Sequence, residues 1–381
     1  MNQLCDFTAG NLHFFKKFRF DSHYKNLIHR IKKTLTRDQG FECVMRTRFS
    51  NSLKIGNFMT PVLISHNDLL RMSSVDEDMS LTFNLEYQMS KISQGTGDKT
   101  LSYIKPEESD PFIYLQTAVL YTHRDGTRRV RVHNFCVPTS SRISDIHDSI
   151  DCEAYASFLF KLQIDKVFKS KKMINSILYS EEIFKTFISA IFNNIQMHSK
   201  ELPENIEYLP LYFCGILKNR VCCKDEIGLK LDIDTSNFIR IKILRMSDNE
   251  IINFIYPKFF QIHHLMLDKS LGVKDDDGNV NLPEIVSAHS NSLENDGVYL
   301  IDNGYILILY IKLQCNPELV DNLFGVKSLT EIKSQVQESN IIGRENDICN
   351  RLTNIIDYLR SSKTFYQNLM IVFETTDSER L

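Results

Sequence analysis

The stretch Gly40–Ser50 reads GFECVMRTRFS, and its alternation of apolar and polar residues predicts a β-strand. Successive side chains of a strand point to opposite faces. One face of this strand would be apolar and would consist of Phe41, Cys43, Met45 and Phe49. The other face would carry Val44 and two arginines, Arg46 and Arg48. We therefore expect a strand that presents two guanidinium groups side by side.

Two further regions repeat this alternation. Leu81–Met89 alternates cleanly between apolar and polar residues, as a half-solvated antiparallel strand does. Phe112–Thr122 and Val130–Val137 flank a polar turn that contains Gly126, which is typical of a β-hairpin. Residues 40–150 are therefore predicted to form an antiparallel β-sandwich.

An amphipathic helix is predicted before this strand. Ser22 can cap its first turn, and Gly40 would close it. Apolar residues at helical spacing follow the cap: Tyr24, Leu27, Ile28, Ile31 and Leu35. We expect the helix to dock on the rest of the protein by this stripe.

Basic residues concentrate around this helix and strand. Between His13 and Arg48 the chain has ten Lys or Arg and three acidic residues, an excess of seven positive charges. Such a patch can face an anionic membrane or an acidic peptide, and it can equally be a solvated helix face. The formal net charge of −3 for the whole chain argues against a general affinity for nucleic acid.

The pattern changes after the predicted sandwich. Four segments have apolar residues at helical spacing: Cys152–Phe168, Glu181–Gln196, Leu209–Lys218 and Asp248–Tyr256. They predict an all-α helical domain over residues 151–252. Beyond Pro257, alternating strands bracket a turn at Asn303, and a helix and a last strand follow. Residues 253–381 are therefore predicted to form a small α/β domain, and the whole chain is a multidomain α+β protein.

Composition is that of a globular protein. The 381 residues exceed what one core usually holds, and the contents of 43% hydrophobic and 24% charged residues lie in the globular range. The longest apolar run, Tyr305–Ile311, is too short to cross a membrane, and Met1–Gly10 does not resemble a secretory signal. The nine cysteines contain no CxxC pair, which predicts reduced thiols in the cytosol.

Three motifs resemble catalytic or metal sites without fitting them. Gly95–Thr100 has the wrong glycine spacing for a phosphate-binding loop. The segment from Val273 to Glu284 has calcium-loop spacing, but Val273 stands where the first acidic ligand belongs. His263 and His264 are adjacent, so their side chains should diverge, and neither Glu nor Cys stands at ligand spacing beside them. We therefore expect no catalytic residues and no metal site.

The order of several motifs resembles the Sec24 family, the cargo adaptors of the COPII vesicle coat. The stretches are Thr8–Leu12 (TAGNL), Gly40–Ser50, YLQTAVLYT and TRRVRVHNFCVP within Phe112–Pro138, Leu209–Lys218 (LPLYFCGILK), Ile252–Leu265 (INFIYPKFFQIHHL), Gly297–Gly304 (GVYLIDNG) and Leu323–Gly325 (LFG). They cover nearly the whole chain. The partner subunit of the same coat shares this fold, but VMRTR, RRVRV and the PLY helix resemble the adaptor more closely.

The resemblance implies a domain order. Residues 1–39 would be the C-terminal end of an α/β trunk, 40–150 a β-sandwich, 151–252 a helical domain and 253–381 a gelsolin-like domain. The zinc module of the family is absent from this chain, so no cofactor is expected.

The resemblance also implies a binding site. In the family, a pocket that reads acidic sorting signals on cargo tails includes positions that correspond to Arg46, Arg48 and Leu120. Forked guanidinium donors suit carboxylates, and leucine supplies an apolar neighbour. A second basic group would extend this surface toward lipid headgroups and consists of Arg128, Arg129 and Arg131. Both groups can also be ordinary solvated strand residues.

The expected function is that of a non-enzymatic coat subunit, cytoplasmic and peripheral on endoplasmic reticulum exit sites and COPII vesicles. Its expected partners are a Sec23-type coat subunit, the cytosolic tails of cargo and SNARE proteins, and an anionic membrane surface, but not nucleic acid. Two alternatives remain at this point: a partner-type subunit that activates the Sar-type GTPase, and a standalone gelsolin-like interaction protein.

Overall fold

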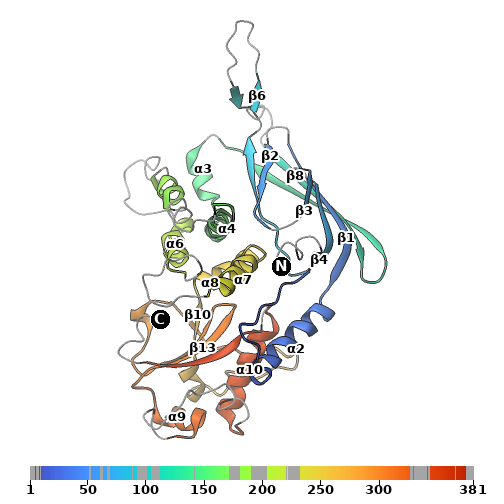
Figure 1. Ribbon diagram of the computed structural model, residues 1–381. Coiled ribbons are helices and arrows are strands. Elements are labelled where there is room, and N and C mark those ends of the chain that lie inside the picture. Colours follow the sequence, from blue (N-terminus) through green and yellow to red (C-terminus); the bar gives the residue numbers. More distant parts are fainter. Residues whose placement is uncertain are drawn as a thin grey trace. The chain divides into compact units, whose positions relative to one another are not determined.

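Strand β1 (Gln39–Phe49) is the central strand of a five-stranded antiparallel sheet with the order β3-β4-β1-β8-β9 (Figure 1). The other strands are β3 (Leu63–His66), β4 (Leu69–Asp76), β8 (Phe112–His123) and β9 (Arg128–Pro138). The β8–β9 hairpin closes through Gly126, whose φ of 85° is one that glycine adopts without strain. The predicted hairpin is confirmed.

A second sheet of β2 (Leu53–Phe58) and β5 (Phe83–Tyr87) completes the sandwich. The core between the two sheets contains Cys43, Met45, Ile55, Phe58, Leu70, Met72 and Tyr121. A separate two-stranded ribbon is formed by β6 (Met89–Lys91) and β7 (Leu101–Tyr103). The antiparallel β-sandwich predicted from alternation is confirmed.

The computed structural model describes residues 5, 8, 10–50, 53–60, 63–66, 69–87, 89–91, 101–103, 112–140, 142–170, 181–189, 204–219, 221, 232–326, 329, 341, 344–364 and 366–374. These residues form two compact units. The first combines Met1–Lys16 with Arg37–Ile251, and the second combines Lys17–Thr36 with Ile252–Leu381. The chain is therefore a multidomain protein of mixed α+β class.

Helices complete the first unit. Among the described residues they include α3 (Ile143–Asp148), α4 (Cys152–Ser170), α6 (Leu209–Lys218), α7 (Ile233–Ile243) and the first residues of α8 (Asp248–Ile255). Lys161 of α4 is fully buried, and its Nζ donates a hydrogen bond of 2.8 Å to Oγ1 of Thr82. Oγ1 of Thr60 donates to the carbonyl of Leu244 over 3.2 Å. The helical region is thus joined to the sandwich by buried polar contacts.

The second unit contains a five-stranded sheet with the order β11-β10-β12-β13-β14. Its described strands are β10 (Lys258–Gln261), β11 (Ile285–Val286), β12 (Val298–Asp302), β13 (Ile306–Ile311) and β14 (Asn368–Phe373). The β13–β14 pair is parallel, and the pairs β10–β11, β10–β12 and β12–β13 are antiparallel. Two α-helices, α9 (Pro317–Phe324) and α10 (Asp347–Ser361), add Leu319, Leu323, Leu352 and Ile356 to its core. This is the α/β domain that the sequence predicted.

Helix α2 (Phe20–Thr36) also belongs to the second unit, but it presents a different face from the one predicted. Asn26 and Arg30 are its buried residues, each 6% exposed, whereas the predicted stripe includes Ile28 at 46% and Leu35 at 75% exposure. Burial raises the pKa of Tyr305, and the charge of the neighbouring Arg30 acts in the opposite direction. The expectation that the apolar stripe docks is therefore wrong, because the polar residues on the other side make the contact.

None of the helices that the structure describes is long and apolar enough to pass through a lipid bilayer.

Candidate functional site

The sheet face that points away from the sandwich core carries arginines next to apolar side chains. Residues opposite one another in an antiparallel pair share a face. Val44 of β1 pairs with Arg71 of β4 on one side and with Leu120 of β8 on the other. Leu120 pairs in turn with Val130 of β9. One row across four strands therefore consists of Arg71, Val44, Leu120 and Val130.

Two neighbouring rows extend this face. The second row consists of Leu69, Arg46, Ala118 and Val132, and the third consists of Arg48, Gln116 and Asn134. Arg46 and Arg48 are two residues apart on one strand, so their Cα atoms are roughly 7 Å apart. We call these three rows the arginine face. Arg71 and Arg46 are next to Val44, Arg48 lies two residues further along β1, and the apolar residues of β8 and β9 lie beside them.

The arginine face is open to solvent. Arg46, Arg48 and Arg71 are exposed, whereas the alternate residues of β1, such as Met45 and Thr47, are buried. Within the described part of the chain, Arg48 and Arg71 form no ion pair. These two guanidinium groups can therefore bind an external carboxylate without first breaking a salt bridge.

Apolar surface adjoins the cations. Leu120 is partly buried, but Val130 is 64% exposed and Val132 is 50% exposed on the edge strand β9. Long side chains reach diagonal neighbours across a pleated sheet. An extended peptide lying here would therefore meet guanidinium groups and aliphatic side chains together.

A β-bulge in β1 changes one residue of the predicted pattern. The register shifts between Phe41 and Val44, and Glu42 between them has a φ of 49°. Phe41 was expected on the core face, but it pairs with Thr122 and is 42% exposed. The expectation for Phe41 is therefore wrong, because the extra residue of a bulge reverses the alternation.

Two residues of the second predicted basic group, Arg129 and Arg131, lie on the opposite side of β9 from the arginine face. Arg129 and Arg131 pair with Tyr121 and Val119, which contribute to the sandwich core side. Nη2 of Arg129 contacts the Asp125 carboxylate at 2.5 Å, and Nε of Arg131 donates to the Tyr121 hydroxyl over 3.1 Å.

Arg128 lies on the other side of β9 from these two arginines. It pairs with Thr122, and its Nη1 donates to the Thr122 hydroxyl over 2.7 Å. The same nitrogen lies 3.5 Å from a carboxylate oxygen of Glu42. Arg128 thus lies beyond the end of the arginine face and contacts Thr122 and Glu42 of the same sheet.

Sequence reasoning missed Arg71. The alternation in Leu69–Asp76 buries Leu70 and Met72 and therefore turns Arg71 outward, which the sequence could have indicated. Its position beside Val44 depends on the β1–β4 register. No local pattern encodes that register, so the third cation is a finding of the structure.

Two of the motifs that resemble catalytic or metal sites have different outcomes: one lies outside the described residues, and the other forms a turn. Gly95–Thr100 lies outside the described residues. In the segment with calcium-loop spacing, Oδ1 of Asp275 accepts a hydrogen bond of 2.7 Å from the backbone of Asn279, and Gly278 has a φ of 83°. This segment is a tight turn in which the Asp275 carboxylate accepts a hydrogen bond from the backbone of the turn itself.

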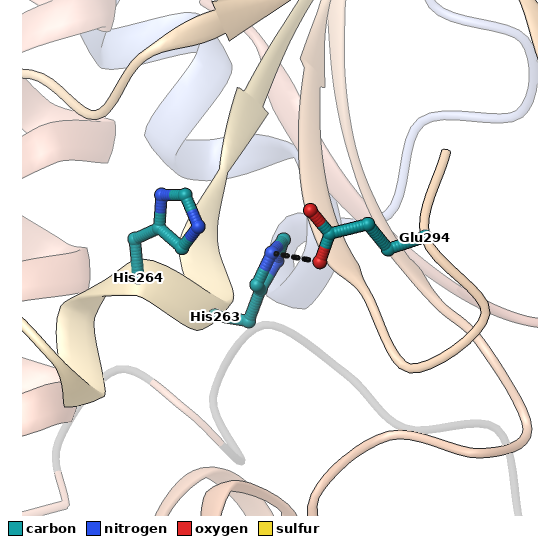
Figure 2. A group of neighbouring side chains, drawn as sticks. All are labelled: His263, His264 and Glu294. Atoms are coloured by element: carbon teal, nitrogen blue, oxygen red, sulfur yellow. Dashed lines mark ion pairs between the residues drawn. The ribbon is translucent and has the colours of Figure 1, made fainter. Parts of the chain in front are cut away.

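The two adjacent histidines do not diverge as expected. Figure 2 shows His263 and His264 gathered with Glu294, and the ligand atoms of the three residues lie within 4.8 Å of one another. Glu294 comes from a distant part of the sequence, so spacing beside the histidines could not reveal it.

Comparisons with known proteins agree with this architecture. The family described as "Sec23/Sec24 beta-sandwich domain" matches residues 40–140, and the family described as "Gelsolin repeat" matches residues 279–347. The chain is 27% identical to protein transport protein SEC24 of Dictyostelium discoideum, over 100% of this chain and 36% of that protein. It is 23% identical to Sec24B of Homo sapiens, over 97% of this chain and 28% of that protein.

A solved structure shows the same fold. The crystal structure of the human COPII-coat protein Sec24c superposes with a TM-score of 0.80 at 21% identity, covering 98% of this chain and 45% of that one. The chain thus spans about a third of the length of the curated relatives it matches.

Proposed function

Because the chain is a Sec24-like member of the Sec23/Sec24 family, we propose that it works in the COPII coat as a non-enzymatic adaptor for transport from the endoplasmic reticulum to the Golgi. Its arginine face would bind acidic sorting signals on the cytosolic tails of cargo and SNARE proteins. The observation that carries this proposal is the row in which Arg71 and Leu120 flank Val44, next to Arg46.

The chemistry of this face suits an acidic peptide with an apolar residue. Guanidinium groups offer forked donors that match the two oxygens of a carboxylate. Arg46, Arg48 and Arg71 supply three such groups, and Leu120 with Val130 supplies an aliphatic neighbour. Such an exposed site gives modest affinity for one tail, and many coat subunits on one membrane would add avidity.

A peptide titration tests the site. A fluorescently labelled acidic cargo-tail peptide is titrated with the wild-type chain and with the double variant Arg46→Ala/Arg48→Ala. We expect the double variant to lose about tenfold in affinity, because it removes two solvent-exposed charge-assisted contacts of roughly 0.5–1 kcal/mol each. Equal binding by both proteins would refute the assignment.

The opposite face of the hairpin provides a matched control. The variant Arg129→Ala/Arg131→Ala removes the same charge from β9, but from the side that faces Tyr121 and Val119. It should bind the peptide within about twofold of the wild type, since long-range charge effects are largely screened at physiological salt. An equal loss in this control would indicate a nonspecific charge effect.

The other predicted contacts belong to the same proposal. A Sec23-type subunit would be the coat partner, and the coat would place the chain on the cytosolic surface of exit sites and vesicles. Arg128, Arg129 and Arg131 would approach anionic lipid, although the last two already contact Asp125 and Tyr121. Sedimentation of the chain with phosphatidylserine vesicles tests the contact with lipid. Unchanged vesicle binding after alanine substitution of the three arginines would refute this contact.

The relatives favour an adaptor over the two alternatives. The curated relatives reported above carry Sec24 names, which favours the adaptor over a partner-type activator of the Sar-type GTPase. The gelsolin repeat at residues 279–347 keeps a standalone interaction protein as a second candidate. GTP hydrolysis with and without the chain, and co-sedimentation with actin filaments, test these alternatives, and we expect no effect in either assay.

A further inference from the structure

Three metal-ligating side chains meet in the gelsolin-like unit, apart from the arginine face. His263 and His264 belong to the short 3-10 helix η3 (Ile262–Met266), which directly follows β10. Glu294 lies in the connection between η4 (Ser290–Ser292) and β12. Their potential ligand atoms are within 4.8 Å of one another (Figure 2). The fold therefore joins two imidazoles and a carboxylate from separate segments.

The ring of His263 is held in place by the backbone of β12. Its Nδ1 lies 3.2 Å from both the carbonyl oxygen and the amide nitrogen of Val298. The ring packs edge-on against Tyr299, with 5.4 Å between the ring centroids. Only 14% of the His263 side chain is exposed. A histidine whose Nδ1 is held by a backbone group presents its Nε2 in a fixed direction, as metal-binding histidines do.

Glu294 is positioned by the same strand. Its backbone amide donates a hydrogen bond of 2.7 Å to the hydroxyl of Tyr299, a fully buried side chain. The amide of Gly297 donates to the Glu294 carbonyl over 3.2 Å. A Cβ atom at Gly297 would collide with the Tyr299 ring, so this glycine is required for the close packing. The carboxylate is thus presented from an ordered turn.

The contact between His263 and Glu294 lacks a hydrogen bond. Nε2 of His263 lies 3.2 Å from Oε2 of Glu294, yet this buried nitrogen has no hydrogen-bond partner among the described residues. When Nδ1–H donates to the Val298 carbonyl, the Nε2 lone pair faces a carboxylate oxygen. Two acceptors in contact repel each other, and a cation bound by both removes the repulsion.

We propose that His263, His264 and Glu294 bind one divalent transition-metal ion, with Zn²⁺ as the best fit. Two imidazole nitrogens and one carboxylate oxygen are a donor set that Zn²⁺ accepts, with a fourth position left for water. Mg²⁺ and Ca²⁺ prefer oxygen ligands throughout, so this set disfavours them.

The distances require only local adjustment. Ligand atoms around a tetrahedral Zn²⁺ are about 3.3 Å apart, given bonds of about 2.0–2.1 Å to nitrogen and oxygen. The His263–Glu294 distance of 3.2 Å already meets this value. His264 is partly exposed, and its ring lies 4.6 Å from that of His263, so a side-chain rotation can bring its nitrogen to the ion. The bound ion would link η3 to the connection that precedes β12.

A Zn²⁺ titration of the full chain tests this site. The chain is treated with a chelator, freed of it, and titrated with Zn²⁺ in competition with a chromogenic chelator. We expect one tight equivalent, and a loss of about tenfold or more in affinity for each of His264→Ala and Glu294→Gln. Circular dichroism checks their folding, which should persist because His264 is partly exposed and Glu294 is exposed.

A control variant and a spectroscopic probe keep the result interpretable. His133→Ala removes an exposed histidine of β9 and should leave Zn²⁺ affinity unchanged. Substitution with Co²⁺ should give the visible bands of a nitrogen and oxygen site without thiolate charge transfer, which excludes the nine cysteines as ligands. The proposal is overturned when the wild type binds no tight equivalent, when both variants bind as tightly as it does, or when thiolate bands appear.

Discussion

The two faces of strand β1 differ in what they do with their side chains. On one face, Cys43 and Met45 are 1% and 7% exposed and pack with Leu70 in the sandwich core. On the other, Arg46 and Arg48 are exposed beside Leu120. The residues of the core face stabilise the sheet. The residues of the arginine face contribute little to stability and are available to bind a ligand. Substitutions on the two faces should therefore affect different quantities.

The largest expected effect is on the core face. Leu70→Ala should lower the free energy of unfolding by about 2–5 kcal/mol, because it removes a buried side chain and leaves a cavity. Leu69→Ala is the matched control, since Leu69 is the next residue and pairs with Arg46 on the arginine face. We expect it to change stability by less than about 1 kcal/mol. Chemical denaturation measures both, and equal losses would contradict the comparison.

Lys161 is a buried cation, in contrast to the exposed Arg46 and Arg48, and its burial should make stability depend on pH. Burial lowers the pKa of Lys161 to about 8, although Asp248 and Glu250 raise it. Below about pH 8 the amine is protonated in both the folded and the unfolded chain and adds no pH dependence. Between about pH 8 and 10.5 the unfolded chain binds more protons, so this group should increase the free energy of unfolding by about 3 kcal/mol.

The variant Lys161→Met isolates this effect from other titrating groups. The quantity to follow is the unfolding free energy of Lys161→Met minus that of the wild type. It should be constant below about pH 8 and fall by about 3 kcal/mol as pH rises toward 10.5, because only the wild type gains stability there. Denaturation curves at several pH values measure it. A constant difference across that range would show that Lys161 is not the buried titrating group.

The smallest stability effects concern arginines. Arg37 has 8% of its side chain exposed, and its Nη2 lies 2.8 Å from a carboxylate oxygen of Asp76. Arg37→Ala should lower the free energy of unfolding by about 1–3 kcal/mol, because it leaves a half-buried carboxylate without its partner. Arg48→Ala should change it by less than about 0.5 kcal/mol. Thermal unfolding compares the two, and a larger effect at Arg48 would assign that residue to structure.

Local patterns predicted much of the first unit, because alternation directly reports which side of a strand is buried. The stretch Gly40–Ser50 indicated a strand with Arg46 and Arg48 on one face, and the structure agrees. It did not indicate the bulge that turns Phe41 outward, since a bulge arises from pairing with a partner strand. The same limit hides Arg71, which reaches Val44 only through the register of β4.

Helix α2 shows a second limit. Its helical spacing was predicted correctly, but the pattern cannot say which stripe of a helix finds a partner. The structure buries Asn26 and Arg30 instead of Ile28 and Leu35. His263, His264 and Glu294 show the corresponding limit for sites, because only the tertiary fold brings the carboxylate to the histidines.

The central claim is that the arginine face selects peptides by their carboxylates. The most direct measurement is a charge-reversal titration of one cargo-tail peptide and its analogue with Lys in place of each acidic residue. The wild-type chain should prefer the acidic peptide, and Arg46→Glu/Arg48→Glu should prefer the lysine analogue, because opposite charges attract across this exposed face. An unchanged preference for the acidic peptide in the charge-reversed variant would contradict the account.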